Sequence, residues 1–388
     1  MAGKFGRIRL AAALGAACAT LVVLPTAAQA APTAAQAAPA AAADPHAGTL
    51  AALKAFQSAA GPGAGVYAGD AANSWSLSAG TGTINTNAPI QPDEHFRAGS
   101  QTKTFTAATV LQLVDEGKVS LETPIEKYLP GVVQGNGYDG NAITVRQLLH
   151  HTSGIAAYEP LLSRPAANPD GSYSLDALVR EGLKRAPASA PGTAYLYSNT
   201  NYMILGMLVE KTTGTPVHRA ITDRIITPLG LTRTVFPAPG DHSLPTPAVN
   251  GYHGVRFAGL YFWTPVLDYD PSAFSSSGAM ISTERDLAKF YQALIGGKVV
   301  SPAALAEMQN AKGADYEGGG YGLGLIRRDL PCGGSAWGHN GMVPGYYSMT
   351  MVTADGRHVS VVTNAHLTTN VPAAQMDKVV TTALCEGR

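Results

Sequence analysis

Ser100 and Lys103 stand three residues apart, where the sequence passes from a loop into an apolar segment. Residues at this spacing lie on one face of a helix, so the Lys103 amine can reach the Ser100 hydroxyl. A serine hydroxyl is a weak nucleophile until a base removes its proton, and a lysine can be that base when burial or a cationic environment lowers its pKa. The pair therefore predicts nucleophilic catalysis at Ser100. The alternative is structural, because a serine at the beginning of a helix is commonly an N-cap.

The segment that follows Ser100 is predicted to be a central helix. Gly117 ends this helix, and the side chains of the helix are apolar on almost every face. This pattern is typical of a helix buried in the middle of a domain. The free N–H groups and the positive dipole end at its start favour negative charge that develops beside Ser100. The residues with the i, i+3, i+4, i+7 spacing of a helix are Ala107, Val110, Leu111 and Val114.

A second group of candidate residues, Tyr197 and Asn199, lies in a predicted loop over residues 191–201, directly before a predicted helix. Residues two apart on an extended loop point the same way. The phenol can then carry a proton while the carboxamide bonds a substrate amide. Taken alone, this pattern is more typical of a turn followed by an N-cap.

A third group is His339, Asn340 and Gly341, at the end of one predicted strand and before another. Gly341 would let a substrate backbone approach the strand edge closely. The N–H of Met342 is a candidate oxyanion donor beside the N–H of Ser100. We therefore expect His339 to Met342 to bind substrate.

The order of predicted elements indicates the fold. Strands are expected near 65–69 and 73–78, helices and loops dominate to about residue 280, and strands return between 322 and 364 before a closing helix at 372–384. The predicted class is α/β (α+β): one antiparallel sheet flanked by helices, with an inserted all-α lobe and a site between the two. We expect one domain at 47–388, with the sheet region at about 47–117 and 283–388 and the helical lobe at about 118–282.

The N-terminus has the pattern of an export signal. Three basic residues precede an apolar run that leads to the small residues Ala28 and Ala30, which predicts a signal peptide at 1–30, a disordered Ala/Pro-rich leader at 31–46 and a secreted protein. Cys18 would leave with the signal. The remaining Cys332 and Cys385 favour a disulfide in an exported protein, and two separate buried thiols are the alternative.

Composition excludes several classes of partner. Removal of the first 30 residues takes away three basic residues and no acidic one, leaving 24 basic against 27 acidic residues. This balance indicates neither nucleic acid nor, after signal removal, a membrane as partner. No histidine cluster accompanies the cysteines at metal-ligand spacing, so neither a metal nor an organic cofactor is expected.

The three groups in this order resemble the signature motifs of the penicillin-recognising serine hydrolases, in the branch where Tyr and His occupy the second and third motifs. The similarity is greatest to secreted D-alanyl-D-alanine carboxypeptidase/transpeptidases and class C β-lactamase-like proteins, and it covers residues 50–385. Other stretches that carry it are Leu111–Lys118, Ile143–Gln147, Tyr197–Tyr202, Tyr321–Leu325, Arg327–Leu330 and Cys332.

The resemblance implies a β-lactamase/transpeptidase-like fold and an acyl-enzyme mechanism. Ser100 would attack the carbonyl of a peptide of D-residues, Lys103 would take its proton, and Tyr197 would pass a proton to the leaving amine. Asn199 would hold the amide of the acyl group. The expected partners are a small peptide of the cell-wall stem type and β-lactams as inhibitors, and we expect a monomer.

Two positions depart from the family pattern. Ile326 stands where the carboxypeptidase has an arginine for the terminal carboxylate of its substrate, and Asn340 stands where Thr is usual. Arg327 should point to the opposite face of the sheet, and Arg328 lies roughly 6 to 7 Å further along the strand. His339 would complete the electrostatics near that carboxylate, but a free carboxylate would be bound less well.

Several functions remain open at this point. The first hypothesis is a D-alanyl-D-alanine carboxypeptidase-like hydrolase or acyltransferase. A D-stereospecific amidase, aminopeptidase or esterase is the main alternative, and a β-lactamase is another. From a different class, the chain would be a non-catalytic penicillin-binding module.

Overall fold

The computed structural model describes residues 44–388 except 159–162, 258–259, 267, 312–314, 317–318 and 368–371. The predicted signal peptide and most of the predicted leader, residues 1–43, lie outside the described residues. Within the described residues, no helix combines the length and the apolar character that crossing a bilayer requires.

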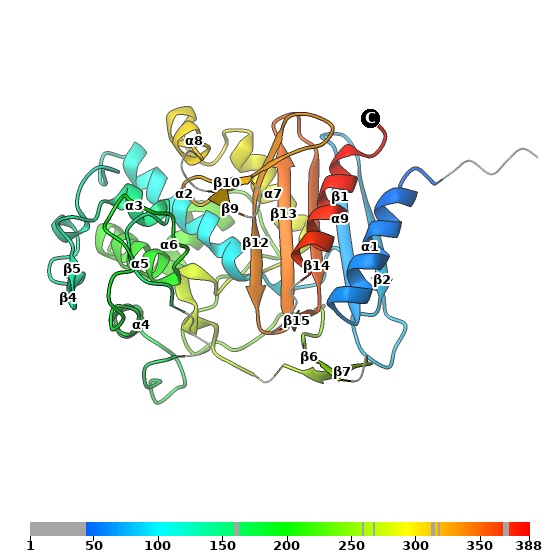
Figure 1. Ribbon diagram of the computed structural model, residues 1–388, viewed down its shortest axis with the longest axis horizontal. Coiled ribbons are helices and arrows are strands. Elements are labelled where there is room, and N and C mark those ends of the chain that lie inside the picture. The colour runs from blue at the N-terminus through cyan, green and yellow to red at the C-terminus, as the bar shows by residue number, and fades with distance from the viewer. Residues whose placement is uncertain are drawn as a thin grey trace, which may run out of the picture. The chain divides into compact units, whose positions relative to one another are not determined.

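In this part of the chain, eight strands form one antiparallel sheet (Figure 1). Their order is β2-β1-β14-β13-β12-β11-β10-β9, so strands from the beginning of the domain pair with strands from its end. Strands β13 and β14 are buried along their whole length, as expected in the middle of a sheet covered on both faces. The strands are β1 Gly63–Gly69, β2 Ser74–Gly80, β9 Asp315–Tyr316, β10 Gly319–Tyr321, β11 Ile326–Asp329, β12 Ser335–Val343, β13 Tyr346–Thr353 and β14 His358–Thr363.

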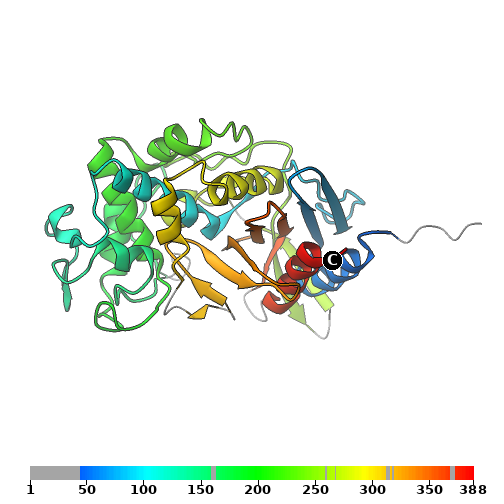
Figure 2. The same ribbon diagram turned by 90° about the horizontal axis from the view of Figure 1, so that it is seen from above.

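Helices cover both faces of this sheet. The helices α1 (Ala47–Ala60) and α9 (Ala373–Cys385) lie side by side on one face, and α7 (Glu284–Ile295) lies on the other (Figure 2). The apolar side chains of α1 and α9 form one core with the inner faces of β1 and β14. Cys385 at the end of α9 forms a disulfide with Cys332, with 5.6 Å between the Cα atoms.

The other helices form the lobe beside the sheet, and α2 (Thr102–Asp115) runs between the two parts. Almost every residue of α2 is buried, so the predicted central helix is confirmed. Gly117 ends this helical segment with a positive φ of 70°, as expected for a C-terminal glycine. The remaining helices are α3 Val145–Leu149, α4 Leu175–Gly182, α5 Asn199–Thr213, α6 Val217–Ile221 and α8 Pro302–Met308, with the 3-10 turns η1 Gly99–Gln101, η2 Ile125–Lys127, η4 Pro271–Ala273 and η5 Ser275–Ser277 and the π turn η3 Thr222–Ile226.

The structure differs from the predicted element pattern in two places. The segment expected to be all helix and loop also contains strands, because β6 (Tyr252–Phe257) pairs with β7 (Leu260–Pro265) on one side and with β15 (Ala365–Leu367), which follows the last strand of the large sheet, on the other. Residues 322–325, where strands were expected to return, form a turn that leads into β11. Shorter pairs are β3 Phe96–Arg97 with β8 Ile281–Ser282, and β4 Gln134–Gly135 with β5 Tyr138–Asp139.

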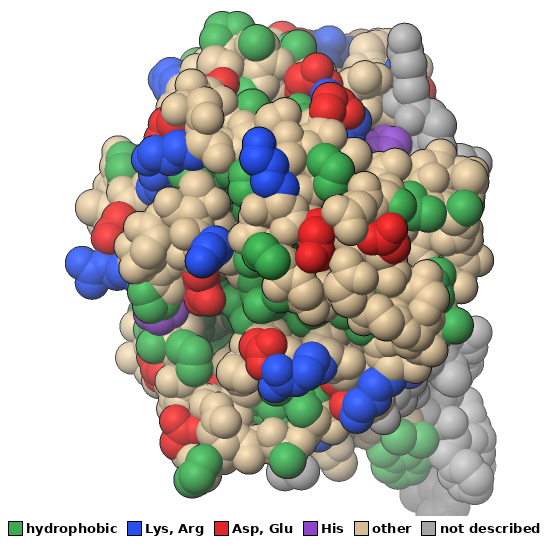
Figure 3. Space-filling model, turned by 90° about the vertical axis from the view of Figure 1, so that its left-hand side faces the viewer, with side chains coloured by type: hydrophobic (Ala, Val, Ile, Leu, Met, Phe, Trp, Pro, Cys, Tyr) green, Lys and Arg blue, Asp and Glu red, His purple; other side chains and the backbone are tan. Residues whose placement is uncertain are grey.

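Charges of both signs are interspersed on the side of the helical lobe (Figure 3). Arg146, for example, pairs with Glu122 and Glu307 at 2.6 and 2.7 Å. This face of the described chain therefore shows a mixed pattern, whereas a nucleic-acid interface presents a basic stripe.

Candidate active site

Ser100 and Lys103 lie where the central helix begins, with Ser100 in η1 and Lys103 in the first turn of α2. The side chain of Lys103 is completely buried. Its Nζ donates hydrogen bonds to Ser100 Oγ (2.9 Å), to Asn199 Oδ1 (2.8 Å) and to the main-chain oxygen of Ser277 (2.7 Å). The structure therefore brings the predicted nucleophile and base into direct contact.

These contacts prepare Lys103 to accept a proton. The oxygens of Asn199 and Ser277 that it contacts can only accept hydrogen bonds. A neutral Lys103 amine can keep N–H bonds to both, and its lone pair then points at the Ser100 hydroxyl. One geometry thus serves the ammonium form and the amine form, so proton transfer from Ser100 requires no movement of the lysine.

Tyr197 comes to the same place from the loop before α5, and Asn199 comes from the first residue of that helix, not from the predicted loop. Lys103 Nζ lies 4.8 Å from the centre of the Tyr197 ring, and the phenol itself is half-buried. The amide of Asn199 is already in use at both ends, because Oδ1 accepts from Lys103 and Nδ2 donates to Tyr158 O at 3.0 Å. A carboxamide has a second lone pair and a second N–H, and these remain for a substrate amide.

The edge of β12 provides the other wall of the site. Strand β11 pairs with β12 only from Ser335 to Gly338, so the part from His339 to Val343 lies beside η1 instead. A β carbon on Gly99, whose φ is +56°, would lie 2.9 Å from the Met342 nitrogen. The residue before Ser100 is therefore packed against the predicted second oxyanion donor.

Gly341 makes a close contact within the chain, and its expected contact with a substrate backbone stays a prediction. It lies inside β12, not after the end of a strand, and a β carbon there would lie 1.9 Å from Ala98 O. The close approach that requires glycine is therefore made by the chain leading into Ser100. This contact fixes the distance between the nucleophile and the strand edge.

His339 is neutral in this site. Its Nδ1 is 2.6 Å from Asn340 O, which can only accept, so Nδ1 carries the proton, and Nε2 lies 3.1 Å from the Tyr321 hydroxyl oxygen. Burial, together with the nearby positive charge of Lys103, lowers the pKa of His339 to about 3. His339 lies near Tyr197 as predicted, with 6.4 Å between ring centres, but it supplies no positive charge for a substrate carboxylate.

Ile326 is fully buried and packs with Tyr321 against the rings of Tyr195 and Tyr197. The two neighbouring arginines are engaged elsewhere: exposed Arg327 pairs with Asp329 at 2.7 Å, and Arg328 pairs with Asp377 of α9 at 3.1 Å. The position that faces Tyr197 is therefore apolar, as the sequence indicates.

Three residues of the site were missed or given another role from the sequence. Ser277 contributes only a main-chain oxygen, which no side-chain pattern can reveal. Tyr321 bonds His339 from a stretch that carried only the family resemblance. His151 was not among the site residues expected from the sequence, and its ring centre lies 4.4 Å from that of Tyr197.

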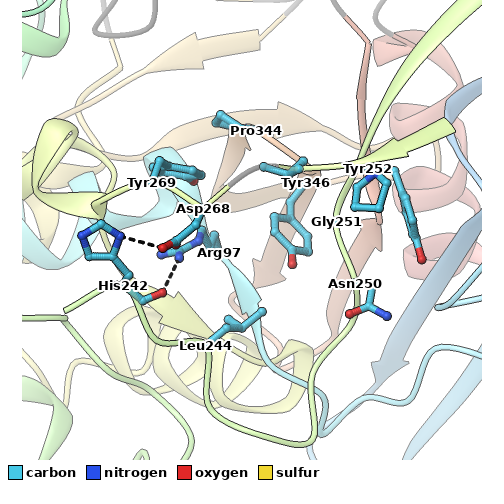
Figure 4. A pocket seen from close by; sticks show the side chains of 12 residues that line it. Arg97, His242, Leu244, Asn250, Gly251, Tyr252, Asp268, Tyr269, Pro344 and Tyr346 are labelled. Atoms are coloured by element: carbon cyan, nitrogen blue, oxygen red, sulfur yellow. Dashed lines mark hydrogen bonds and ion pairs between the residues drawn. The ribbon is translucent and has the colours of Figure 1, made fainter. Parts of the chain in front are cut away.

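A cavity of about 430 Å³ lies beside the segment that leads into Ser100 (Figure 4). Arg97 reaches into its wall, donates to His242 O at 2.9 Å and lies over the ring of Tyr269. His242 in turn contacts Asp268 at 3.0 Å. These contacts tie β3 to the loops around it, so Arg97 helps to fix the backbone from which Ser100 projects.

No metal chemistry is required by this arrangement. Among the described residues, no three His, Cys, Asp or Glu side chains come together in a way that would hold a metal ion. What the contacts around Ser100 support is acyl transfer by an activated serine.

The chain belongs to the Beta-lactamase family, whose profile matches residues 27–383. It is similar to a D-stereospecific amidohydrolase from Streptomyces sp., with 37% identity, a TM-score of 0.78, and 88% of this chain and 99% of that chain covered. It is also similar to Penicillin-binding protein 4 of Amycolatopsis lactamdurans, with 29% identity over 76% of this chain and 78% of that protein. The D-amino acid amidase of Ochrobactrum anthropi SV3 has 25% identity and a TM-score of 0.70 over 85% of this chain and 96% of its own. The resemblance to penicillin-recognising serine hydrolases and the mixed fold class are thereby confirmed.

Proposed function

We propose that this chain is an exported serine hydrolase that cleaves D-aminoacyl amide or ester bonds whose leaving group carries no carboxylate. The observation that carries the proposal is the apolar environment of Ile326 beside Tyr197. A terminal carboxylate buried there would lose its hydration without gaining a charged partner, since His339 is neutral and Arg328 is paired with Asp377. The similarity to a D-stereospecific amidohydrolase supports the same choice.

In the proposed reaction, Ser100 Oγ attacks the carbonyl carbon of the D-aminoacyl group while its proton moves to Lys103. Negative charge on the carbonyl oxygen is stabilised by the N–H groups of Ser100 and Met342. Tyr197 then protonates the leaving amine or alcohol as the bond to it breaks. In the second half, a water molecule gives a proton to the Tyr197 oxygen and attacks the ester carbonyl. The bond from Ser100 Oγ to the acyl carbon then breaks, Oγ takes its proton back from Lys103, and the D-residue product leaves as the free acid.

The test compares two substrates that differ only at the leaving-group end: a peptide ending in D-Ala-D-Ala and the C-terminal amide of the same peptide, with the corresponding L-peptides as controls. We expect kcat/KM for the amide to exceed that for the free acid by at least about tenfold, because burial of an unpaired carboxylate costs several kcal/mol. Faster cleavage of the free acid would overturn the proposal. Ser100→Ala should remove both activities while the protein stays folded, and retained turnover would contradict the nucleophile assignment.

Ile326→Arg tests the specificity argument directly. A guanidinium at this position supplies a charge-assisted bond to a carboxylate, so the ratio of kcat/KM values should move toward the free acid by about tenfold. Ile326→Met, which keeps the volume and the apolar character, is the matched control and should leave the ratio unchanged. An equal change of the kcat/KM ratio in Ile326→Arg and Ile326→Met would show that altered packing, and not the added charge, causes the effect.

A D-alanyl-D-alanine carboxypeptidase, the first hypothesis from the sequence, is the second candidate function. A curated relative from Escherichia coli carries this name with 35% identity, over 36% of this chain and 33% of that protein. Exposure to benzylpenicillin tests the step that both functions share, which is acylation of Ser100. We expect a mass adduct on the wild type and none on Ser100→Ala. The substrate comparison above then separates the two activities.

Export is part of the proposal and has its own test. The basic and apolar pattern of residues 1–30 supports it. We expect protein recovered from the culture medium to begin after Ala30 and to contain the Cys332–Cys385 disulfide. Accumulation inside the cell with the first 30 residues intact would contradict export.

A further inference from the structure

We propose that His151 is a positioning residue for Tyr197 and that it acts as a neutral imidazole whose Nδ1 accepts two hydrogen bonds from the catalytic loop. The inference depends on the role of Tyr197 in acyl transfer, but not on which acyl donor the enzyme uses. It assigns to this histidine, which lies just after α3, a function in the reaction in addition to packing.

The first step is the set of bonds at Nδ1. This atom is 3.2 Å from the main-chain nitrogen of Ser198 and 3.1 Å from Nδ2 of Asn201. In addition, the main-chain oxygen of His151 accepts from Leu196 N at 2.8 Å. The residues on both sides of Tyr197 are therefore bonded to the same histidine.

The second step is the direction of each bond. Ser153 Oγ accepts from Ile155 N at 3.1 Å, so its hydroxyl proton is free to be donated to Asn201 Oδ1 at 2.7 Å. Asn201 Oδ1 is then the acceptor and its Nδ2 is the donor to His151. Because both groups at Nδ1 are donors, Nδ1 must be unprotonated, and the ring proton resides on Nε2.

The third step is the surroundings of the ring. His151 is fully buried, and Nε2 has no hydrogen-bond partner among the residues that the structure describes. The ring lies against four tyrosines, with centre-to-centre distances of 4.4 Å to Tyr197, 5.0 Å to Tyr321, 5.1 Å to Tyr202 and 6.0 Å to Tyr195. It therefore supports the phenol ring of Tyr197 directly while it holds the backbone on either side.

The fourth step is charge. Burial, followed by the positive charge of Lys103 and the neighbouring His339 and His150, lowers the pKa of His151 well below its ordinary value. Protonation of Nδ1 would also break both bonds to the loop. The histidine is thus kept neutral, and no second positive charge competes with the protonation of Lys103.

The backbone conformation of His151 is energetically unfavourable, and a residue that only fills space would not require it. Its φ is +57°, in the left-handed region that non-glycine residues seldom adopt. Asparagine tolerates this conformation well, and its Oδ1 occupies about the place of a histidine Nδ1. This offers a conservative variant: His151→Asn keeps the acceptor and loses the ring, whereas His151→Phe keeps a ring and loses the acceptor.

The experiment measures acylation per active site by the burst of 4-nitrophenol from 4-nitrophenyl acetate, which contains no D-residue. Cleavage of this ester by the wild type without cleavage of any D-aminoacyl amide would refute only the proposed function. For His151→Phe we expect the acylation rate to fall about 100-fold with KM changed less than about threefold, as misplacement of a catalytic group predicts. The acylation rate of His151→Asn should be at least about tenfold higher than that of His151→Phe. The control at the adjacent histidine, His150→Asn, should have an acylation rate within about threefold of the wild type.

Rates within threefold of the wild type for His151→Phe, or no recovery in a folded His151→Asn, would overturn the proposal. The proposal would also be overturned if His151→Phe showed a smaller burst amplitude with an unchanged acylation rate per active site. An equal fall in the acylation rate of His150→Asn would overturn it as well. A measurement on the wild type covers the case in which the variants do not fold. The nitrogen NMR signal of His151 Nδ1 should show an unprotonated nitrogen from pH 5 to pH 9, and an imidazolium signal in this range would contradict the assignment.

Discussion

Replacement of Asn199 by Asp tests whether Lys103 must lose its proton for Ser100 to react. The two side chains have nearly the same shape, and Oδ1 of residue 199 lies 2.8 Å from Lys103 Nζ. The change places a carboxylate against the lysine in a site where Asn199 is only 8% exposed. The ammonium form of Lys103 gains an attraction that the amine form does not have.

The magnitude follows from the distance. Two unit charges 2.8 Å apart attract by about 6 kcal/mol at an effective dielectric constant of 20. Each 1.36 kcal/mol corresponds to about tenfold in rate, so even half of this figure predicts an acylation rate roughly 100-fold below that of the wild type. The fold should persist, because Asn199 is the first residue of α5, where a negative charge is stabilised by the helix dipole by about 0.3–1 kcal/mol.

The assay is the pre-steady-state burst with a 4-nitrophenyl ester between pH 6 and pH 10. Asn199→Ala is the control, because it removes the N–H bond to Tyr158 O, as the Asp variant does, and adds no charge beside Lys103, and we expect it to lose only about tenfold. An Asp variant within tenfold of the wild type would refute the assignment of Lys103 as base. Equal losses in Asp and Ala would attribute the effect to the lost amide.

Three further predictions follow from single contacts. Gly99→Ala should lower acylation about 100-fold without unfolding the protein, because its β carbon would meet the Met342 nitrogen at 2.9 Å, and an unchanged burst rate would contradict this contact. Burial raises the pKa of Glu284 in the folded protein well above its ordinary value of 4.5. As pH rises, the unfolded chain therefore releases this proton before the folded protein does, and the free energy of unfolding falls between about pH 4.5 and the pKa of the folded state. Glu284→Gln should therefore raise the melting temperature relative to the wild type more at pH 8 than at pH 4, and an equal effect at both would be contrary to this linkage. Replacement of Cys332 and Cys385 by Ser removes a cross-link that spans 53 residues and should lower the free energy of unfolding by about 4 kcal/mol in urea titrations, whereas a wild type indifferent to reductant would show that the bond is not formed.

The local patterns of the sequence were sufficient for the elements that carry the site. The apolar surface of α2, the spacing of Ser100 and Lys103, and the pairing of early with late strands all depend on contacts within one element or on the order of elements. The strand β6 could not be predicted in the same way, since it pairs with β15, more than 100 residues further along the chain, and β7 in turn pairs with β6.

Residue types and their spacing along the chain already indicate which chemistry is available: a serine with a lysine one turn away, a tyrosine near an asparagine, and a histidine two residues before a glycine. The protonation states and orientations of these groups depend on contacts that exist only in the fold. Lys103 is held by a main-chain oxygen of Ser277, and His151 supports Tyr197 from a distant part of the chain. The physical reason is that burial, charge and hydrogen-bond direction arise from segments that meet only in the folded protein.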